Sequence, residues 1–253
     1  MMLEQLKILK NHGKQFIPDI RKATVPAPFR GRAEISTQAV DETELVRLCP
    51  TGAILSQPLR IDHGKCVFCN ECAMAYPDKI HFTNDHRLAS NDRSRLIVAA
   101  GDTAKIALDP EMVRKEIRKI FGRSLKLRQV CAGGDNSTEK ELAACGNVNF
   151  DMARFGIEFV ASPRHADGIV LSGPISAAMA APFETAYAAV PEPKLLILAG
   201  VDAISGGIFA ESPALNRAVL DKYSVDLYVP GNPPHPLTFI CGILDLIQSK
   251  SKR

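Results

Sequence analysis

The chain has 253 residues, a length that suggests one large domain or two small ones. Its 46% hydrophobic and 23% charged residues are the proportions of an ordinary soluble globular protein. The formal net charge of +3 is too small to suggest that the protein binds nucleic acid. Seven cysteines, four of them in a metal-binding pattern, favour a reducing compartment over a disulfide framework.

Residues 1–31 are expected to form a short helix and an extended linker. Apolar residues mix with lysines over residues 2–14, and two prolines in the linker favour an extended backbone. No small-residue cleavage site follows, so the helix does not read as a secretory signal. It either lies on a membrane surface or docks on a partner or on its own domain. No segment is expected to span a membrane, because the best candidate, residues 169–190, holds two prolines and a glutamate.

Residues 32–84 carry cysteines with the spacing of bacterial ferredoxins. Cys66, Cys69 and Cys72 are separated by two residues each, and Cys49 stands before a proline at the end of a second, similar run. In two-cluster ferredoxins the fourth cysteine of each run ligates the cluster held by the other run. Cys49, Cys66, Cys69 and Cys72 are therefore predicted to ligate one [4Fe–4S] cluster.

The ligands of a second cluster are missing. The same spacing puts its four ligand positions at Ala39, Glu42, Leu45 and Tyr76. Random decay would leave two broken half-sites, whereas this pattern keeps one whole set and deletes the other. The alternatives are a zinc site and unpaired thiols. A cysteine triplet with a distant Cys-Pro fits the usual structural zinc patterns poorly.

Residues 85–130 are expected to connect two modules and to carry a basic helix. Asp109 and Pro110 are typical of a helix start, with the Asp as N-cap and the Pro in the first turn. The pattern predicts a helix that ends at Gly122 and is rich in arginine and lysine. Such a face is usually solvated, and the alternative is contact with an acidic partner surface.

Residues 131–253 are predicted to form an α/β domain. Short apolar runs begin at residues 157, 169, 195 and 225, and helical stretches are expected at 176–190 and 212–222. Buried strands separated by helices predict a parallel sheet with helices on both faces. Functional loops of such sheets lie at the carboxyl ends of the strands. Cys131, Cys145 and Cys241 are expected to be small buried apolar residues.

Several long motifs resemble the small subunit of energy-converting [NiFe]-hydrogenases. That family includes the formate hydrogenlyase small subunit and the 20 kDa or B subunit of complex I. The motifs lie at residues 121–128, 154–157, 161–167, 172–174, 191–194, 205–209 and 228–234. Residues 29–32 and 64–69 resemble the iron–sulfur subunit that neighbours the small subunit in those complexes. The fold that this fusion implies is an α+β ferredoxin-like module followed by an α/β flavodoxin-like parallel-sheet domain.

The resemblance also implies a proximal [4Fe–4S] cluster, but this chain lacks its four cysteines. The matching positions hold Asp135, Thr138, Asp202 and Asn232. Such oxygen ligands suit Mg²⁺ or Ca²⁺ better than an iron–sulfur cluster, and a hydrogen-bonded polar pocket is the alternative. Glu139 matches a glutamate on the proton route of the hydrogenases. Its alternative role is that of a carboxylate stabilised at a helix N-terminus.

The resemblance implies an iron–sulfur subunit of a membrane-associated complex related to complex I or energy-converting hydrogenase. The expected partners are a large subunit and membrane-arm subunits, with the protein peripheral on the cytoplasmic face of the inner membrane. Because one ferredoxin cluster and the proximal cluster are lost, we expect an accessory or structural role with no catalytic residue. The alternatives are a genuine electron-transfer subunit and a small-molecule or hard-metal binding module in the vacated pocket.

Overall fold

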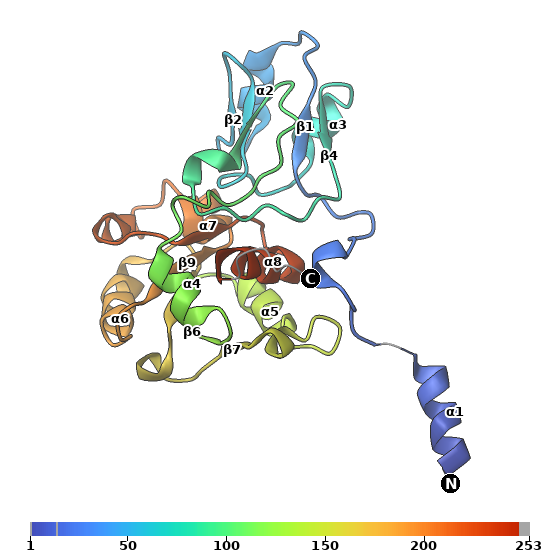
Figure 1. Ribbon diagram of the computed structural model, residues 1–253. Coiled ribbons are helices and arrows are strands. Elements are labelled where there is room, and N and C mark those ends of the chain that lie inside the picture. The colour runs from blue at the N-terminus through green and yellow to red at the C-terminus, as the bar shows by residue number, and fades with distance from the viewer. Residues whose placement is uncertain (1, 14, 248–253) are drawn as a thin grey trace.

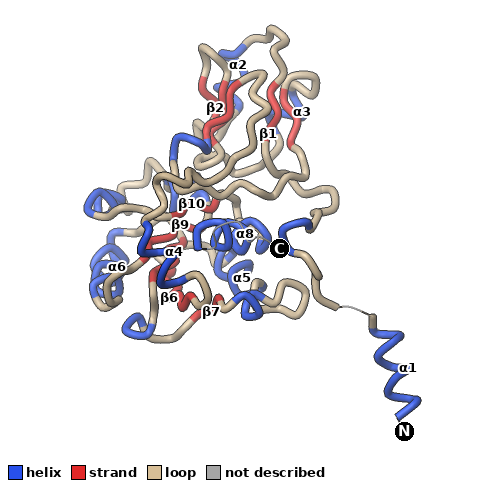
Figure 2. Tube along the Cα trace, in the orientation of Figure 1, coloured by secondary structure: helices blue, strands red, loops and turns tan. Residues whose placement is uncertain are grey.

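The computed structural model describes residues 2–13 and 15–247. Two bodies of different architecture lie one on the other (Figure 1). The smaller body, from the first half of the chain, contains short antiparallel strands. The larger body, from the second half, contains a parallel sheet. Figure 2 shows that long loops run between the two bodies.

The larger body is built on five parallel strands in the order β10-β9-β8-β6-β7. These strands are β6 (Leu125–Cys131), β7 (Ile157–Phe159), β8 (Gly168–Ser172), β9 (Leu195–Ala199) and β10 (Leu227–Val229). All residues of β8 and β9 are buried, as expected for central strands covered on both faces. The predicted parallel α/β domain is confirmed, and its order is compatible with a flavodoxin-like domain. The sheet begins at Leu125, inside the segment expected to be a connection.

Helices cover both faces of this sheet. Along β8, the Val170 side chain belongs to the apolar cluster on one face of the sheet. The side chains of Ile169 and Leu171 belong to the cluster on the other face. The first face is covered by α4 (Lys115–Phe121), α5 (Ser137–Ala144) and α8 (Pro236–Ile247). The second is covered by α6 (Ala177–Ala188), α7 (Val201–Ser205) and the 3-10 helix η6 (Arg217–Lys222). The other 3-10 helices are η1 (Ile20–Lys22), η2 (Arg93–Leu96), η3 (Met152–Phe155), η4 (Pro163–His165) and η5 (Gly207–Phe209).

Two of the expected helices differ from the structure. The stretch 212–222 is helical only in η6, because Ser212 closes a turn and the Asn216 amide donates to the Ile175 carbonyl. Helix α4 begins at Lys115 instead of Glu111. The Asp109 carboxylate accepts from the Glu111 amide in a turn, and Arg114 has a non-helical ψ of 128°. The Asp109 backbone also exchanges hydrogen bonds with the Asn91 side chain at 2.7 and 2.9 Å, so this part of the chain is held by tertiary contacts.

The smaller body has two antiparallel sheets and two short helices. Its strands are β1 (Ala33–Ile35), β2 (Ile54–Leu55), β3 (Arg60–Asp62), β4 (Ile80–Phe82) and β5 (Ile97–Ala99). β1 pairs with β4, and β3 lies between β2 and β5. The helices are α2 (Glu42–Leu48) and α3 (Glu71–Ala75). Strands β2 and β4 follow the two cysteine runs in the sequence.

The segment 85–130 is part of both bodies. Its strand β5 extends the antiparallel sheet of the smaller body. Ser90 and Tyr228 exchange backbone hydrogen bonds of 3.0 and 2.8 Å beside the larger body. Buried residues of both bodies also belong to one continuous apolar cluster. The two bodies are therefore held together by backbone pairing and by a shared core.

Helix α1 (Met2–His12) has no buried residue and stands away from the rest of the chain (Figure 1). The predicted N-terminal helix is confirmed, whereas Lys14, part of the same charge pattern, lies outside the described residues. Met2 and Leu3 are 75% and 73% exposed, so the apolar side of α1 contacts no part of the described chain extensively. Within residues 2–13 and 15–247, no helix is long and apolar enough to cross a membrane.

Candidate functional site

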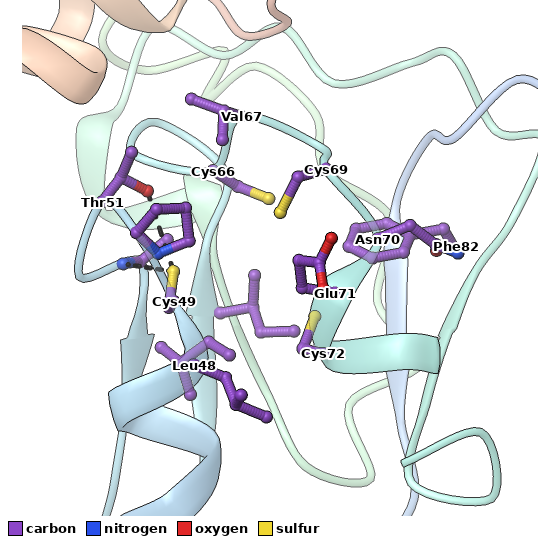
Figure 3. Close-up of a pocket in the computed structure, with 14 residues that line it drawn as sticks. Leu48, Cys49, Thr51, Cys66, Val67, Cys69, Asn70, Glu71, Cys72 and Phe82 are labelled. Atoms are coloured by element: carbon purple, nitrogen blue, oxygen red, sulfur yellow. Dashed lines mark hydrogen bonds between the residues drawn. The ribbon is translucent and has the colours of Figure 1, made fainter. Parts of the chain in front are cut away.

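The four predicted cysteine ligands line a single pocket in the smaller body. Cys49 follows the last residue of α2, Cys66 and Cys69 lie on the loop between β3 and α3, and Cys72 is on α3. Figure 3 shows their sulfur atoms turned toward a common space. Residues that lie far apart in the sequence are thus brought together by the packing of α2 beside α3.

Burial and mutual repulsion control the charge of these thiols. Cys66 is 8% exposed, and burial together with smaller contributions from Cys72, Cys49 and Cys69 raises its pKa to about 12. Burial raises the pKa of Cys72 to about 11, and Cys69 and Cys49 add to the shift. The four thiols therefore lie within electrostatic reach of one another. Without a cation between them, the two buried thiols are protonated at neutral pH.

Backbone amides point at two of the sulfur atoms. The Ala53 amide donates to Cys49 Sγ at 3.2 Å, and the Phe68 amide donates to Cys66 Sγ at 3.4 Å. Hydrogen bonds to ligand sulfurs stabilise negative charge on them and help to set the reduction potential of iron–sulfur clusters. The site therefore offers groups that stabilise thiolates.

The loop that carries Cys66 and Cys69 has a strained backbone. Phe68 has a φ of 54° and Asn70 a φ of 76°, a region that bulky residues rarely occupy. Arg30 Nε donates to the Phe68 carbonyl at 2.6 Å. The Phe68 ring packs against the rings of His63 and Phe82, each at 5.9 Å between centroids. These contacts hold a conformation that the isolated loop would avoid.

An ion pair fixes the start of the same loop. Arg93 donates two hydrogen bonds to the Asp62 carboxylate, at 2.8 and 2.7 Å. Asp62 also accepts from the Gly64 amide at 2.8 Å, and its carbonyl accepts from the Cys66 amide at 2.9 Å. A Cβ on Gly64 would stand 2.6 Å from the guanidinium carbon of Arg93, so a larger residue there would displace this guanidinium. We refer to Asp62 and Arg93 as the loop clamp.

The geometry of the four thiols differs from that of a site for one ion. Among the described residues, no group of three or more His, Cys, Asp or Glu side chains is close enough to bind a metal ion. In a [4Fe–4S] cluster each cysteine ligates a different iron, so its ligands surround a larger body than a single ion. The shared pocket, the sulfur hydrogen bonds and the four-thiol donor set are features that a [4Fe–4S] cluster requires.

The four positions of the deleted ligand set are engaged in packing or local hydrogen bonds, or are exposed. Leu45 is fully buried in the core of the smaller body. The Tyr76 hydroxyl donates to Glu44 at 2.5 Å, and Glu42 accepts from the Gln57 amide at 2.9 Å. Ala39 is exposed. Apolar packing and local hydrogen bonds thus take the place of a second ligand set.

The four substituted positions of the larger body gather at the carboxyl edge of its sheet. Asp135 lies beyond β6, and its carboxylate accepts from the amide and the hydroxyl of Ser137 at 2.9 and 2.6 Å. Thr138 Oγ1 would stand 2.8 Å from a Cβ on Gly200, which precedes α7. The Val201 amide donates to the Gly231 carbonyl, beside Asn232. The loops after β6, β9 and β10 therefore converge here.

Asp202 is the most perturbed carboxylate at this edge. Burial and the nearby charge of Asp135 raise its pKa to about 6, against the opposing effect of Arg217. Arg217 donates to the carbonyls of Pro174, Asp202 and Ala203 at 2.9–3.2 Å. The cation therefore joins the loop after β8 to α7, a link made by hydrogen bonds instead of a metal.

Glu139 and Cys131 are neighbours at the same edge. Glu139 accepts from the Ser172 hydroxyl at 2.5 Å, and this bond ties α5 to the end of β8. Cys131 is exposed, contrary to prediction, because it is the last residue of β6 and lies at the sheet edge. Burial raises the pKa of its thiol, with a hydrogen bond to Glu139 adding to the shift. Cys145 and Cys241 are buried, as predicted.

Sequence comparison assigns the larger body to a known family. The family model for the 20 kDa subunit of NADH ubiquinone oxidoreductase matches residues 131–246. The chain is 34% identical to the probable membrane-bound hydrogenase subunit mbhJ of Pyrococcus furiosus over 137 residues, which are 54% of this chain and 82% of that protein.

Two other relatives match over smaller shares of their length. The B-type subunit of NADH-quinone oxidoreductase from Heliobacterium modesticaldum is 44% identical over 44% of this chain and 66% of its own length. Formate hydrogenlyase subunit 7 of Escherichia coli is 36% identical over 54% of this chain and 55% of its own length. The chain spans less than two thirds of these two relatives. With its parallel sheet and its match to most of the hydrogenase subunit, the chain belongs to the family of the 20 kDa subunit of NADH ubiquinone oxidoreductase.

Proposed function

We propose that this protein is an iron–sulfur subunit of a membrane-associated oxidoreductase complex related to complex I and energy-converting hydrogenase. The observation that carries the proposal is the single pocket lined by Cys49, Cys66, Cys69 and Cys72. Relatives named as subunits of a membrane-bound hydrogenase, of formate hydrogenlyase and of NADH-quinone oxidoreductase support the class of complex.

In this proposal residues 32–84 are a ferredoxin-like module whose four cysteines hold one [4Fe–4S] cluster. Such a cluster supplies one-electron transfer when bound. The amides of Ala53 and Phe68 stabilise the charged sulfurs, and the loop clamp holds the cysteine loop. Residues 1–31 and 85–130 flank the module, and residues 131–253 form the domain of the 20 kDa type.

We favour an accessory or structural role over catalysis. At the proximal position, Asp135 is engaged by Ser137, and Arg217 links α7 to the neighbouring loop. These hydrogen bonds preserve the shape of the sheet edge without a ligand set for iron. A subunit of this kind keeps its place in a complex after the proximal cluster, the carrier nearest the active site, has been lost.

An electron-transfer role is the second candidate. One pocket is lined both by Phe68, from the cysteine loop, and by Asn232, at the proximal position. The retained site therefore lies on the side of its module that faces the larger body. An electron leaving it would reach the carboxyl edge of the parallel sheet. A hard-metal module in the vacated pocket is the weakest candidate, because the Asp135 carboxylate is already engaged by the amide and the hydroxyl of Ser137.

The proposed partners are a large subunit and membrane-arm subunits. Ile208 and Phe209 are 61% and 43% exposed on η5, directly beyond α7 and Asp202. Exposed apolar side chains at the functional edge of a sheet suit a protein interface. We propose that this edge faces the large subunit and that the protein is peripheral on the cytoplasmic face of the inner membrane.

Ligand variants test the cluster assignment. Protein purified without oxygen is compared with Cys69→Ser and Cys145→Ser by iron and sulfide analysis and by EPR. We expect Cys69→Ser to lose or convert the cluster and Cys145→Ser to keep the wild-type iron content, since Cys145 is buried in the other body. Equal iron in both variants would contradict the assignment.

An affinity-tagged chain in mild detergent tests the partner assignment. Co-purification of a large subunit and membrane-arm proteins is the expected result. Recovery of a lone monomer, with none in the membrane fraction, would refute it.

A further inference from the structure

A second pocket lies at the seam between the two bodies and is not part of the cysteine site. Its cavity volume is about 180 Å³. The smaller body and its linker contribute Phe29, Arg30 and Phe68, and the larger body contributes the loop 230–233 and His235. We name it the seam pocket. Because both bodies form its walls, an occupant would contact them at the same time.

Aromatic rings form much of the wall. The rings of Phe29 and His235 meet edge to face at 5.4 Å between centroids. His235 Nδ1 accepts from the Leu237 amide at 3.1 Å, so the start of α8 fixes this ring. Phe68 is 7% exposed and is held by its ring contacts with His63 and Phe82. Fixed rings of this kind offer flat surfaces to a planar ligand without losing side-chain entropy.

Arg30 places a positive charge at the pocket. Its Nε–H is engaged by the Phe68 carbonyl, which fixes the plane of the guanidinium group. No ion pair among the described residues includes Arg30, and its side chain is exposed. Its terminal N–H groups are thus oriented but not neutralised. A guanidinium fork binds carboxylate and phosphate groups with two parallel hydrogen bonds.

We propose that the seam pocket binds a planar aromatic molecule that carries a phosphate or carboxylate group. The ring lies against Phe29 and His235, and the anionic group pairs with Arg30. Neither feature alone selects this class, because rings bind any flat apolar molecule and an exposed arginine binds any anion. Their combination in one pocket requires both parts in a single ligand.

The occupant would link the cysteine loop to the loop at Asn232. Phe68 lies between Cys66 and Cys69, and Asn232 occupies the proximal position. Binding would therefore stiffen the contact between the two bodies at the point where they approach. The proposal does not depend on the cluster, because the pocket walls are side chains outside the four cysteines.

Equilibrium dialysis of the full chain tests the proposal, with the free probe measured in the protein-free chamber. Flavin mononucleotide is the phosphate probe and 2-naphthoate the carboxylate probe, whereas riboflavin supplies a ring without the charge. We expect saturable binding of one molecule of at least one charged probe per chain. We expect riboflavin to bind about tenfold or more weakly than flavin mononucleotide if the phosphate probe is the one that binds. Absence of saturable binding by both charged probes would overturn the proposal.

Two pocket variants and one control assign the binding to this pocket. Arg30→Met removes the charge, and Phe29→Leu removes a ring while keeping an apolar side chain. Each should weaken binding about tenfold. Arg123→Met, an exposed arginine before β6 at the opposite edge of the sheet, should not change it. Wild-type affinity in both pocket variants would overturn the proposal. Iron content and circular dichroism of each variant separate loss of the ligand from loss of the fold or of the cluster.

Discussion

Leu45 tests whether the place of the deleted cluster is filled by core packing. The side chain is 0% exposed and belongs to the core shared by α2, α3 and the strands of the smaller body. Leu45→Ala removes three buried carbon atoms and leaves a cavity that rigid neighbours fill only in part. Substitutions of this type cost about 2–5 kcal/mol of unfolding free energy. We expect a loss in the upper half of that range only if the surrounding strands do not move into the cavity.

The assay is a urea titration of the full chain without oxygen, followed by far-ultraviolet circular dichroism. With an m-value of about 3 kcal/mol/M, a loss of about 3 kcal/mol lowers the midpoint by about 1 M. Met74→Ala is the matched control, because Met74 lies on α3 and is 61% exposed. The control should change stability by less than about 0.5 kcal/mol. Equal midpoints for Leu45→Ala and Met74→Ala would refute the packing argument.

Three further predictions concern the loop clamp, a buried histidine and the distribution of iron. Arg93→Met leaves the Asp62 carboxylate, which is 6% exposed, without its cation and should lower the free energy of unfolding by about 1–3 kcal/mol. The loss stays below that of a fully buried pair because the Arg93 side chain is 31% exposed, and an unchanged urea midpoint would contradict this prediction. Burial lowers the pKa of His63 from 6.5 to about 4, so the folded state binds fewer protons than the unfolded state between these values. The contribution of His63 to the free energy of unfolding is complete above pH 6.5 and falls by about 1.4 kcal/mol per pH unit as the pH drops toward 4. His63→Gln should flatten this dependence of stability on pH. An unaltered slope of unfolding free energy against pH, measured by urea titration, would disprove the prediction. A chain with Cys66, Cys69 and Cys72 all replaced by serine should be colourless and free of iron when purified without oxygen, and residual brown colour would show that another part of the chain holds a cluster.

Local patterns predicted the parallel sheet well. The apolar run at residues 195–199 is β9 with the expected bounds, and the stretch 176–190 contains α6. Continuous burial leaves a clear signal in the sequence, because each position must be apolar. The shared pocket of the four cysteines was also predictable, since their spacing reflects the geometry of a ligand loop.

Features that depend on distant partners were not predictable. Asp62 and Arg93 are 31 positions apart, and neither belongs to a motif that indicates the loop clamp. Helix α4 does not begin at Asp109, because Asn91 and Arg95 hold this residue in a loop. Phe68 adopts a positive φ only because Arg30 and two rings hold it. In each case tertiary contacts outweigh a local preference of about 1 kcal/mol.

The most direct test of the central claim is the count of iron and acid-labile sulfide in full-length protein purified without oxygen. One [4Fe–4S] cluster on Cys49, Cys66, Cys69 and Cys72 predicts about four irons and four sulfides per chain, with one cluster signal in the EPR spectrum of the reduced protein. About eight irons per chain, or stoichiometric zinc without iron, would contradict the account.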